Sequence, residues 1–377
     1  MKNSLCTMVD HADRIRAEID ERASGGAPRS FPRTVAAINP DGFRVTVTDV
    51  VAETASAKTF RFERAGQVRL LPPFLAGQYV SLHIGGTTRP FAISSSPAQR
   101  AWYDITVRRV PGGRISNHLI DRVGAGDTLT MTGPSGTFHH NPLFHGSEVV
   151  FLAGGSGVAP AMSMLREIVD QRIDRRFHLV YGCRSDSDVI FREELDELAE
   201  RSPNIEVDYV ITDPGPDWRG PTGLLSAEVV ESLTGPLRGR MVYVCGPQAL
   251  YSYALDQLTG AGHPRNRIRF EANGAPADVT AQSRWPAGVD PSGEVTVSVG
   301  AHEFRTPRNR PLLDALEAEG IRPNASCRSG ECGQCRIRVL GGEIYNADEA
   351  RLRMSDEWFG YTHSCVGYPL TDTRLQL

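Results

Sequence analysis

The 377-residue sequence contains no long apolar run. No stretch reaches the length of a membrane-spanning helix, and the first residues, MKNSLCTMVDHADRIRAEIDERA, hold no apolar segment of signal-peptide length. A strong excess of either charge is also missing, because 41 Lys and Arg stand against 45 Asp and Glu. Nucleic acid and membrane surfaces are therefore not indicated as partners, and we expect a cytoplasmic protein.

A disulfide framework is not indicated either. The seven cysteines are an odd number in a large chain without a secretion signal. A chain of this length is also too long for one compact core, so we expect two or three domains.

Four of the cysteines have the spacing of an iron–sulfur site. Cys327, Cys332 and Cys335 share the segment CRSGECGQC, and Cys365 follows after 29 further residues. This C-x4-C-x2-C…C order is the ligand spacing of plant-type [2Fe–2S] clusters, whereas zinc ribbons usually have two close pairs. Glycines between the cysteines allow backbone N–H groups to turn toward the sulfurs. A zinc site or buried free thiols are the alternatives.

The residues around these cysteines predict a small domain. Their pattern indicates two strands around a glycine turn over 294–307, a helix over 311–321 and a second hairpin over 335–344. With CRSGECGQC and the late HSC, residues 291–377 resemble the plant-type ferredoxin fold, a β-grasp. The resemblance implies that the four cysteines bind a [2Fe–2S] cluster.

Residues 41–143 predict an antiparallel β-barrel or sandwich, because turn residues separate alternating strands at 43–51, 58–64, 78–84, 103–110 and 127–133.

Two segments in this region could receive an anion. Arg89 in RPFAISSSP can neutralise a phosphate, and the glycines and Ser116 of GGRISNHL would lie at a helix N-terminus. Each segment alone is a weak signal.

Together the two segments resemble the flavin-binding barrel of the ferredoxin–NADP reductase superfamily. Its pattern is Arg-x-Tyr-Ser-x-x-Ser followed by Gly-x-x-Ser, and Arg89, Ser95, Gly113 and Ser116 match it. The resemblance implies FAD, with FMN as the alternative because one branch with a C-terminal ferredoxin uses it. Phe91 and Ala92 depart from the pattern. The aromatic ring can still lie against the flavin, but the alanine cannot donate the family's hydrogen bond to flavin N5. We expect an altered potential or slower flavin reduction.

From 144 to 275 the pattern changes to alternating strands and helices. It predicts a parallel sheet that binds its ligand at the carboxyl ends of the strands. GGSGVAP resembles the superfamily's Gly-x-Gly-x-x-Pro turn, YGCRSDSDVIF its next strand end, and CGP the segment beside the nicotinamide. The resemblance implies that Cys245 positions the nicotinamide; a buried core thiol is the alternative. It also implies a set of nucleotide-binding residues: Gly154, Gly155, Gly157, Pro160, Arg184, Ser185, Arg192, Gly246 and Pro247.

The choice between NADH and NADPH stays open at this point. Arg184, Ser185 and Arg192 could hold the 2′-phosphate of NADPH, whereas Asp186 and Asp188 would repel it. The balance slightly favours NADH.

The order of flavin barrel, nucleotide domain and ferredoxin, with a tether over 276–290, resembles the reductase components of multicomponent oxygenases and demethylases. It implies that electrons pass from NAD(P)H through flavin to the [2Fe–2S] cluster and on to a partner protein, expected to be a terminal oxygenase, hydroxylase, demethylase or desaturase. The alternatives are a redox-sensing or scaffold module with slow turnover, and reduction of NAD(P)+ by a reduced partner. Residues 1–40 lie outside the resemblance and are an extension of unknown role.

Overall fold

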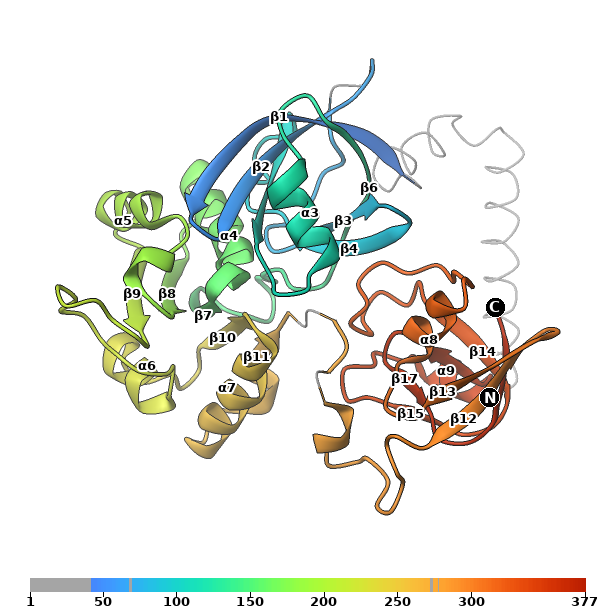
Figure 1. Cartoon of the computed structure of the whole chain (residues 1–377). Coiled ribbons are helices and arrows are strands. Elements are labelled where there is room, and N and C mark those ends of the chain that lie inside the picture. The colour runs from blue at the N-terminus through green and yellow to red at the C-terminus, as the bar shows by residue number, and fades with distance from the viewer. Residues whose placement is uncertain (1–41, 68–69, 272–273, 277) are drawn as a thin grey trace, which may run out of the picture. The chain divides into compact units, whose positions relative to one another are not determined.

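Three large sheets follow one another along the described part of the chain, which confirms the predicted fold class (Figure 1). The computed structural model describes residues 42–67, 70–271, 274–276 and 278–377. The extension 1–40 lies outside the described residues. Residues Gly42–Leu377 form one unit, within which the domain boundaries given above stay predictions.

The first sheet is an antiparallel barrel. Its strands are β1 (Phe43–Thr54), β2 (Ala57–Arg64), β3 (Tyr79–Ile84), β4 (Thr87–Ala92), β5 (Trp102–Arg108) and β6 (Thr128–Ser135), in the order β4-β3-β6-β1-β2-β5. A bridge between Ile93, which follows β4, and Ile105 in β5 joins the two edges and closes the barrel. Alternate side chains of β1 are buried in its core. Helix α3 (Arg114–Arg122) packs its apolar side chains on the same core.

The second sheet is parallel and covered on both faces. Its strands are β7 (Glu148–Gly154), β8 (Arg176–Cys183), β9 (Ile205–Ile211), β10 (Met241–Cys245) and β11 (Ile268–Phe270), in the order β11-β10-β7-β8-β9. Phe151 of β7 lies in one core cluster, and Val150 and Leu152 lie in another. The helices are α4 (Val158–Asp170), α5 (Arg192–Arg201), α6 (Ala227–Thr234) and α7 (Gln248–Gly260). Sequence analysis did not predict α6 or β11.

The third sheet is mixed, as in a β-grasp. It contains β12 (Glu294–Val299), β13 (His302–Pro307), β14 (Arg336–Gly341), β16 (Tyr361–His363) and β18 (Thr373–Gln376), in the order β13-β12-β18-β14-β16. A separate pair is formed by β15 (Ile344–Asn346) and β17 (Gly367–Pro369), and the helices are α8 (Leu312–Ala318) and α9 (Met354–Trp358). The hairpin predicted over 294–307 is confirmed. The hairpin predicted over 335–344 is wrong, because β14 pairs with β16 and β18 while β15 pairs with β17.

The segment predicted as a tether packs against the strand pair β15–β17. Val279 is buried in one core with Tyr345, and the Trp285 ring lies edge-on to Tyr345 with ring centroids 5.2 Å apart. Gln282 accepts hydrogen bonds from the Tyr345 hydroxyl and the Asp348 N–H, each at 3.0 Å. The described part of this segment therefore extends a core and is not a free spacer.

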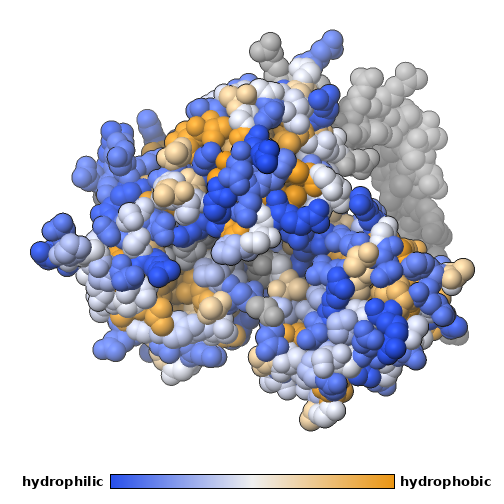
Figure 2. Space-filling view, in the orientation of Figure 1, coloured by the Kyte–Doolittle hydropathy of each residue, from blue (hydrophilic) through white to orange (hydrophobic). Residues whose placement is uncertain are grey.

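The face of the molecule in Figure 2 is mostly hydrophilic, with apolar side chains in smaller patches between polar ones. Among the described residues of 42–377, no helix combines the length and the hydropathy that crossing a lipid bilayer requires.

Candidate functional site

One cavity of about 1140 Å³ is lined by residues from all three predicted cofactor motifs. They come from the end of β4, the turn after β7, the segment after β10 and the start of the cysteine segment (residues 326–335). The cavity therefore gathers motifs that lie far apart in the sequence around one space, as a cofactor site requires. The predicted site residues in its wall are Phe91, Ala92, Ser116, Gly154, Gly155, Pro160, Arg184, Cys245, Gly246, Pro247 and Cys327.

The turn between β7 and α4 lies where the order of the parallel sheet reverses. Strands β7 and β10 are neighbours, and later strands continue from them in opposite directions, so their carboxyl ends flank a crevice. Gly155 has a φ of 53°, which glycine adopts without strain. Gly157 does not line the cavity but packs behind it. A Cβ atom there would overlap the Cys245 carbonyl group and lie 2.6 Å from the Gly246 nitrogen.

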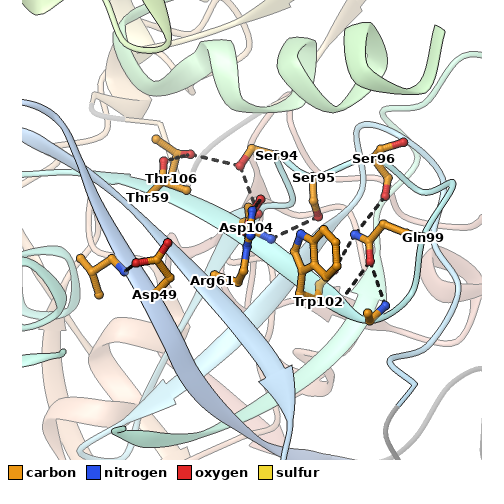
Figure 3. A network of polar contacts seen from close by, with 12 residues as sticks. Asp49, Thr59, Arg61, Ser94, Ser95, Ser96, Gln99, Trp102, Asp104 and Thr106 are labelled. Atoms are coloured by element: carbon orange, nitrogen blue, oxygen red, sulfur yellow. Dashed lines mark hydrogen bonds and ion pairs between the residues drawn. The ribbon is translucent and has the colours of Figure 1, made fainter. Parts of the chain in front are cut away.

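A polar network fixes the segment that follows β4 (Figure 3). Arg61 donates two hydrogen bonds to the Asp104 carboxylate, at 2.8 and 2.9 Å. The Ser94 hydroxyl donates to the Asp104 carbonyl at 3.1 Å, and the Asp104 N–H donates to the Ser95 hydroxyl at 3.1 Å. The Ser163 hydroxyl of α4 donates to the Ser95 carbonyl at 2.7 Å. Ser95, predicted to bind flavin, therefore lies outside the cavity wall and joins the barrel to α4.

Two other residues predicted for the flavin also lie outside the wall. Gly113 is the N-cap of α3, where a Cβ atom would collide with the Ser116 hydroxyl. This glycine thus leaves room for a serine that does line the cavity. Arg89 donates to the Thr88 carbonyl at 2.9 Å and lines a smaller cavity, of about 210 Å³, together with Cys327.

Of the three residues predicted for a 2′-phosphate, only Arg184 lines the cavity. Its guanidinium is largely exposed, and its Nε lies 4.0 Å from a carboxylate oxygen of Asp213, which also lines the cavity. The Ser185 hydroxyl is 3.0 Å from that of Ser187. The negative charge of Asp213 therefore lies beside the positive charge of Arg184.

Arg192 and Asp188 have other partners. Arg192 forms an ion pair with Asp196 at 2.8 Å, and its guanidinium carbon lies 4.1 Å from the ring centroid of Tyr209. Asp188, which was expected to repel a phosphate, pairs with Arg108 at 2.6 Å and so links the parallel sheet to β5 of the barrel.

The structure brings the four cysteines together. Cys327, Cys335 and Cys365 are each 2% exposed, while Cys332 is half-buried. The Sγ atoms of Cys335 and Cys365 are 3.2 Å apart. Three backbone N–H groups donate to sulfur: those of Ser329 and Cys332 to Cys327, at 3.4 and 3.3 Å, and that of Gly330 to Cys365, at 3.2 Å. Thiol hydrogen bonds, from Cys332 first and then Cys365, lower the pKa of Cys327, and these N–H groups lower it further.

Sequence analysis missed two buried polar groups in the wall of the large cavity. The Tyr79 hydroxyl and the Glu271 Oε2 have no hydrogen-bond partner among the described residues. Burial is the largest cause of a raised pKa for both groups, because it disfavours the charged form of each. Buried polar atoms usually have partners, and both residues line the cavity in which a polar ligand would bind. Tyr79 could have been found from the sequence, because it lies in the segment GQYVSL, which also matches the flavin-binding barrel of the superfamily. Glu271 lies in no motif.

Three family models match the chain, one for each part: "Oxidoreductase FAD-binding domain" at 44–140, "Oxidoreductase NAD-binding domain" at 151–256 and "2Fe-2S iron-sulfur cluster binding domain" at 295–370. The chain is also 30% identical over 345 residues to the glycine betaine monooxygenase reductase subunit of Pseudomonas aeruginosa, covering 87% of this chain and 93% of the relative. The chain belongs to the oxygenase reductases of the ferredoxin–NADP reductase superfamily.

This reductase is similar to two further relatives. It is 31% identical over 337 residues to the phthalate 4,5-dioxygenase oxygenase reductase subunit of Pseudomonas putida, covering 88% of this chain and 96% of that one. It is 30% identical over 352 residues to the ferredoxin reductase component of the 3-ketosteroid-9-alpha-monooxygenase of Rhodococcus rhodochrous, covering 88% and 97%. Its fold matches the solved structure of phthalate dioxygenase reductase with a TM-score of 0.63 at 24% identity, covering 89% and 98%.

The predicted activity and cofactors are confirmed at the level of domains. The reductase is an oxidoreductase that passes electrons from NAD(P)H through FAD to a [2Fe–2S] cluster. The residues present fit these groups. The glycine turn offers backbone to a pyrophosphate, and four thiols gather beside three N–H donors. Two residues of the cavity wall, Tyr79 and Glu271, each have a buried polar atom without a partner in the described part of the chain.

Proposed function

We propose that this reductase uses NADH to reduce a terminal oxygenase, and that the large cavity is where the nucleotide, the flavin and the first cluster ligand meet. One observation carries the proposal. Ala92, Cys245 and Cys327, one residue from each cofactor motif, line the same cavity. Electron transfer between cofactors depends on such proximity.

The residues of the barrel and the parallel sheet have separate tasks in this proposal. Phe91 and Ala92 form the wall beside the flavin ring, and Ser116 with the N-terminus of α3 receives a flavin phosphate. The turn Gly154–Gly157 and the N-terminus of α4 receive the pyrophosphate of the nucleotide, while Cys245 positions the nicotinamide. Bound flavin takes up two electrons from the nicotinamide and releases them one at a time. No side chain is required as a general acid or base.

The cysteine segment has the task of holding the cluster and its charge. Cys327, Cys332, Cys335 and Cys365 are the proposed ligands. The N–H groups that donate to the sulfurs of Cys327 and Cys365 stabilise negative charge there, so they favour the reduced cluster.

The surroundings of Arg184 support NADH as the electron donor. A 2′-phosphate would meet the Asp213 carboxylate beside this arginine. Arg192 is engaged by Asp196 and Tyr209 and does not reach the cavity wall. Little net positive charge is therefore available at Arg184 to bind a phosphate dianion.

The names of the relatives support an oxygenase as the electron acceptor. They are reductase components of glycine betaine, 3-ketosteroid and phthalate oxygenases, and each aligns with most of this chain. We propose a terminal oxygenase partner in the cytoplasm.

An anaerobic titration tests the electron route. The loaded protein is titrated with NADH and then, in a second sample, with NADPH, while the flavin band near ~450 nm and the broader cluster bands are followed. We expect both chromophores to bleach, and NADH to act at lower concentration. Bleaching of flavin alone would refute the route through the cluster, and equal action of NADPH would refute the role of Asp213. Slow NADH oxidation with cytochrome c would favour the redox-sensing alternative.

A further inference from the structure

The cysteine segment borders the large cavity at one end and a separate groove further along. Cys327 lines the large cavity, whereas Cys332 lines a groove of about 330 Å³ that shares no predicted nucleotide or flavin residue with it. Cys332 is also the one cysteine of the four that is half-buried instead of fully buried. The cluster site therefore has one ligand toward the electron source and another toward the surface.

Unpaired positive charge surrounds the groove at Cys332. Three arginines line it: Arg336, Arg351 and Arg353. Arg336 is neutralised by Asp356 at 2.8 Å. Arg351 and Arg353 are exposed, and neither has a carboxylate within ion-pair distance among the described residues. Two free guanidinium groups thus remain at its rim.

A further arginine adds to this positive charge, and the carboxylate of Glu331 offsets only part of it. Burial and then the charge of Arg351 lower the pKa of Arg265, so these two guanidinium groups lie near each other. Glu331 also lines the groove, but its carboxylate accepts hydrogen bonds from the N–H and hydroxyl of Thr137 in the barrel. The groove is therefore complementary to carboxylates on a partner.

Large apolar side chains are exposed next to these arginines. Met354 and Trp358 are 66% and 75% exposed, and they lie on one face of α9 because they are four residues apart. Phe359, which follows α9, is 65% exposed. Arg353 immediately precedes this helix. Aromatic side chains and methionine beside arginine are the typical composition of protein–protein interfaces.

We propose that the groove at Cys332, with Arg351, Arg353 and the exposed face of α9, is the docking surface for an acidic electron-accepting protein. The proposal rests on the function proposed above and specifies its partner. The arginines pair with carboxylates of the acceptor, and Trp358 is the apolar anchor. One electron leaves the reduced cluster and reduces a metal centre of the acceptor by one electron, so no proton or further reactant is needed.

Two haem proteins of opposite charge serve as probes: soluble cytochrome b5, which is acidic, and cytochrome c, which is basic. The full-length protein with both cofactors is reduced anaerobically with NADH and mixed with each probe at several salt concentrations, while the haem and cluster bands are followed. The variants are Arg351→Glu with Arg353→Glu, and Trp358→Ser. Their matched controls are Arg219→Glu with Arg238→Glu, and Val51→Ser, all exposed and outside the groove.

We expect the double reversal at 351 and 353 to slow cytochrome b5 reduction about tenfold at low salt, to remove its salt dependence and to speed cytochrome c reduction. Trp358→Ser should slow cytochrome b5 reduction at all salt concentrations. Three results would each overturn the proposed docking surface: wild-type rates in these variants, an equal loss in the controls, or haem reduction that precedes reoxidation of the cluster. NADH bleaching in the same samples separates the two proposals: its absence refutes the function, whereas intact bleaching with unchanged haem reduction refutes the surface alone.

Discussion

The superfamily has a serine at the position of Ala92, so the cavity wall of this protein lacks one hydroxyl. A hydrogen bond contributes about 1 kcal/mol, equivalent to about a fivefold change in rate. We predict that Ala92→Ser speeds NADH-dependent flavin bleaching by about that factor and shifts the flavin potential, as measured by anaerobic stopped-flow absorbance and redox titration. Ala98→Ser, at an exposed position of the next loop, should change neither. Unchanged rate and potential in Ala92→Ser would contradict a role for the missing hydroxyl.

Tyr79 contributes a buried hydroxyl that has no partner among the described residues. A polar group left unsatisfied in this way costs about 1–3 kcal/mol. Tyr79→Phe should therefore raise the melting temperature of the apoprotein. Because Tyr79 lines the cavity, we expect a bound cofactor to supply the missing partner, so the same change should lower the melting temperature of the protein loaded with FAD and cluster. Differential scanning fluorimetry of both forms measures the two shifts.

Tyr103→Phe is the control for this prediction. Its hydroxyl donates to the Pro72 carbonyl, so its loss should destabilise both forms. A shift of the same sign in both forms of Tyr79→Phe would show that its hydroxyl does not meet a cofactor.

Single residues were predictable where the chemistry needs one residue type at a fixed spacing. The four cysteines are one such case, and the structure brings them together. The glycines at 154, 155 and 157 are another, and they form the turn after β7. Ser95 and Arg192 also matched the expected residue types, but their contacts depend on α4 and on Tyr209, which lie elsewhere in the chain. No local pattern shows such contacts.

The turn between β7 and α4 is the element on which nucleotide binding depends. We predict that Gly157→Ala raises the dissociation constant for NADH at least tenfold, because a Cβ atom would force the turn away from Cys245 and Gly246. Equilibrium titration of the loaded protein with NADH measures the change. Gly260→Ala, at the end of α7 with no atom near its Cβ position, is the control and should leave binding unaffected. Wild-type affinity in Gly157→Ala would refute the requirement for close approach.

Elements were predictable where hydrophobic period and local turns agree. Barrel strands β1, β2, β3, β5 and β6 and the hairpin β12–β13 show this agreement, whereas β4 was not predicted. The hairpin over 335–344 was wrong because β18, which ends the chain, pairs with β14. Strand β11 has only three residues, too few for a periodic signal.

At the scale of the whole molecule, polar contacts hold the cysteine segment against the barrel. The Ser326 and Ser81 hydroxyls are 2.6 Å apart, and Glu331 accepts from Thr137. Sequence analysis predicted three modules in order but not these contacts, because they join polar residues of unrelated motifs that lie far apart in the chain. The contacts place Cys327 at the large cavity and so decide whether an electron can pass from one module to the next.

Arg328 makes three further contacts of this kind. It has a φ of 56°, its guanidinium is 8% exposed, and it pairs with Asp314 at 3.3 Å and with Glu317 on α8. Its Nε also donates to the Thr88 carbonyl of β4 at 3.2 Å. This one side chain thus joins the cysteine segment, the ferredoxin helix and the barrel strand that carries Ala92. A buried arginine with several charged partners is costly to replace.

When NADH reduces the protein, the flavin bleaches in a first phase and the cluster in a second. We predict that Arg328→Met slows the second phase about tenfold or more, because the cluster is no longer held at the cavity. The first phase, in which the flavin bleaches, should keep its rate, since the turn after β7 and Cys245 are untouched. Anaerobic stopped-flow absorbance separates the two phases. Arg305→Met, which removes an exposed ion pair with Glu294 in the same domain, should alter neither phase. Equal slowing of both phases in Arg328→Met would indicate general destabilisation, and two unchanged phases would show that the electron path does not depend on this contact.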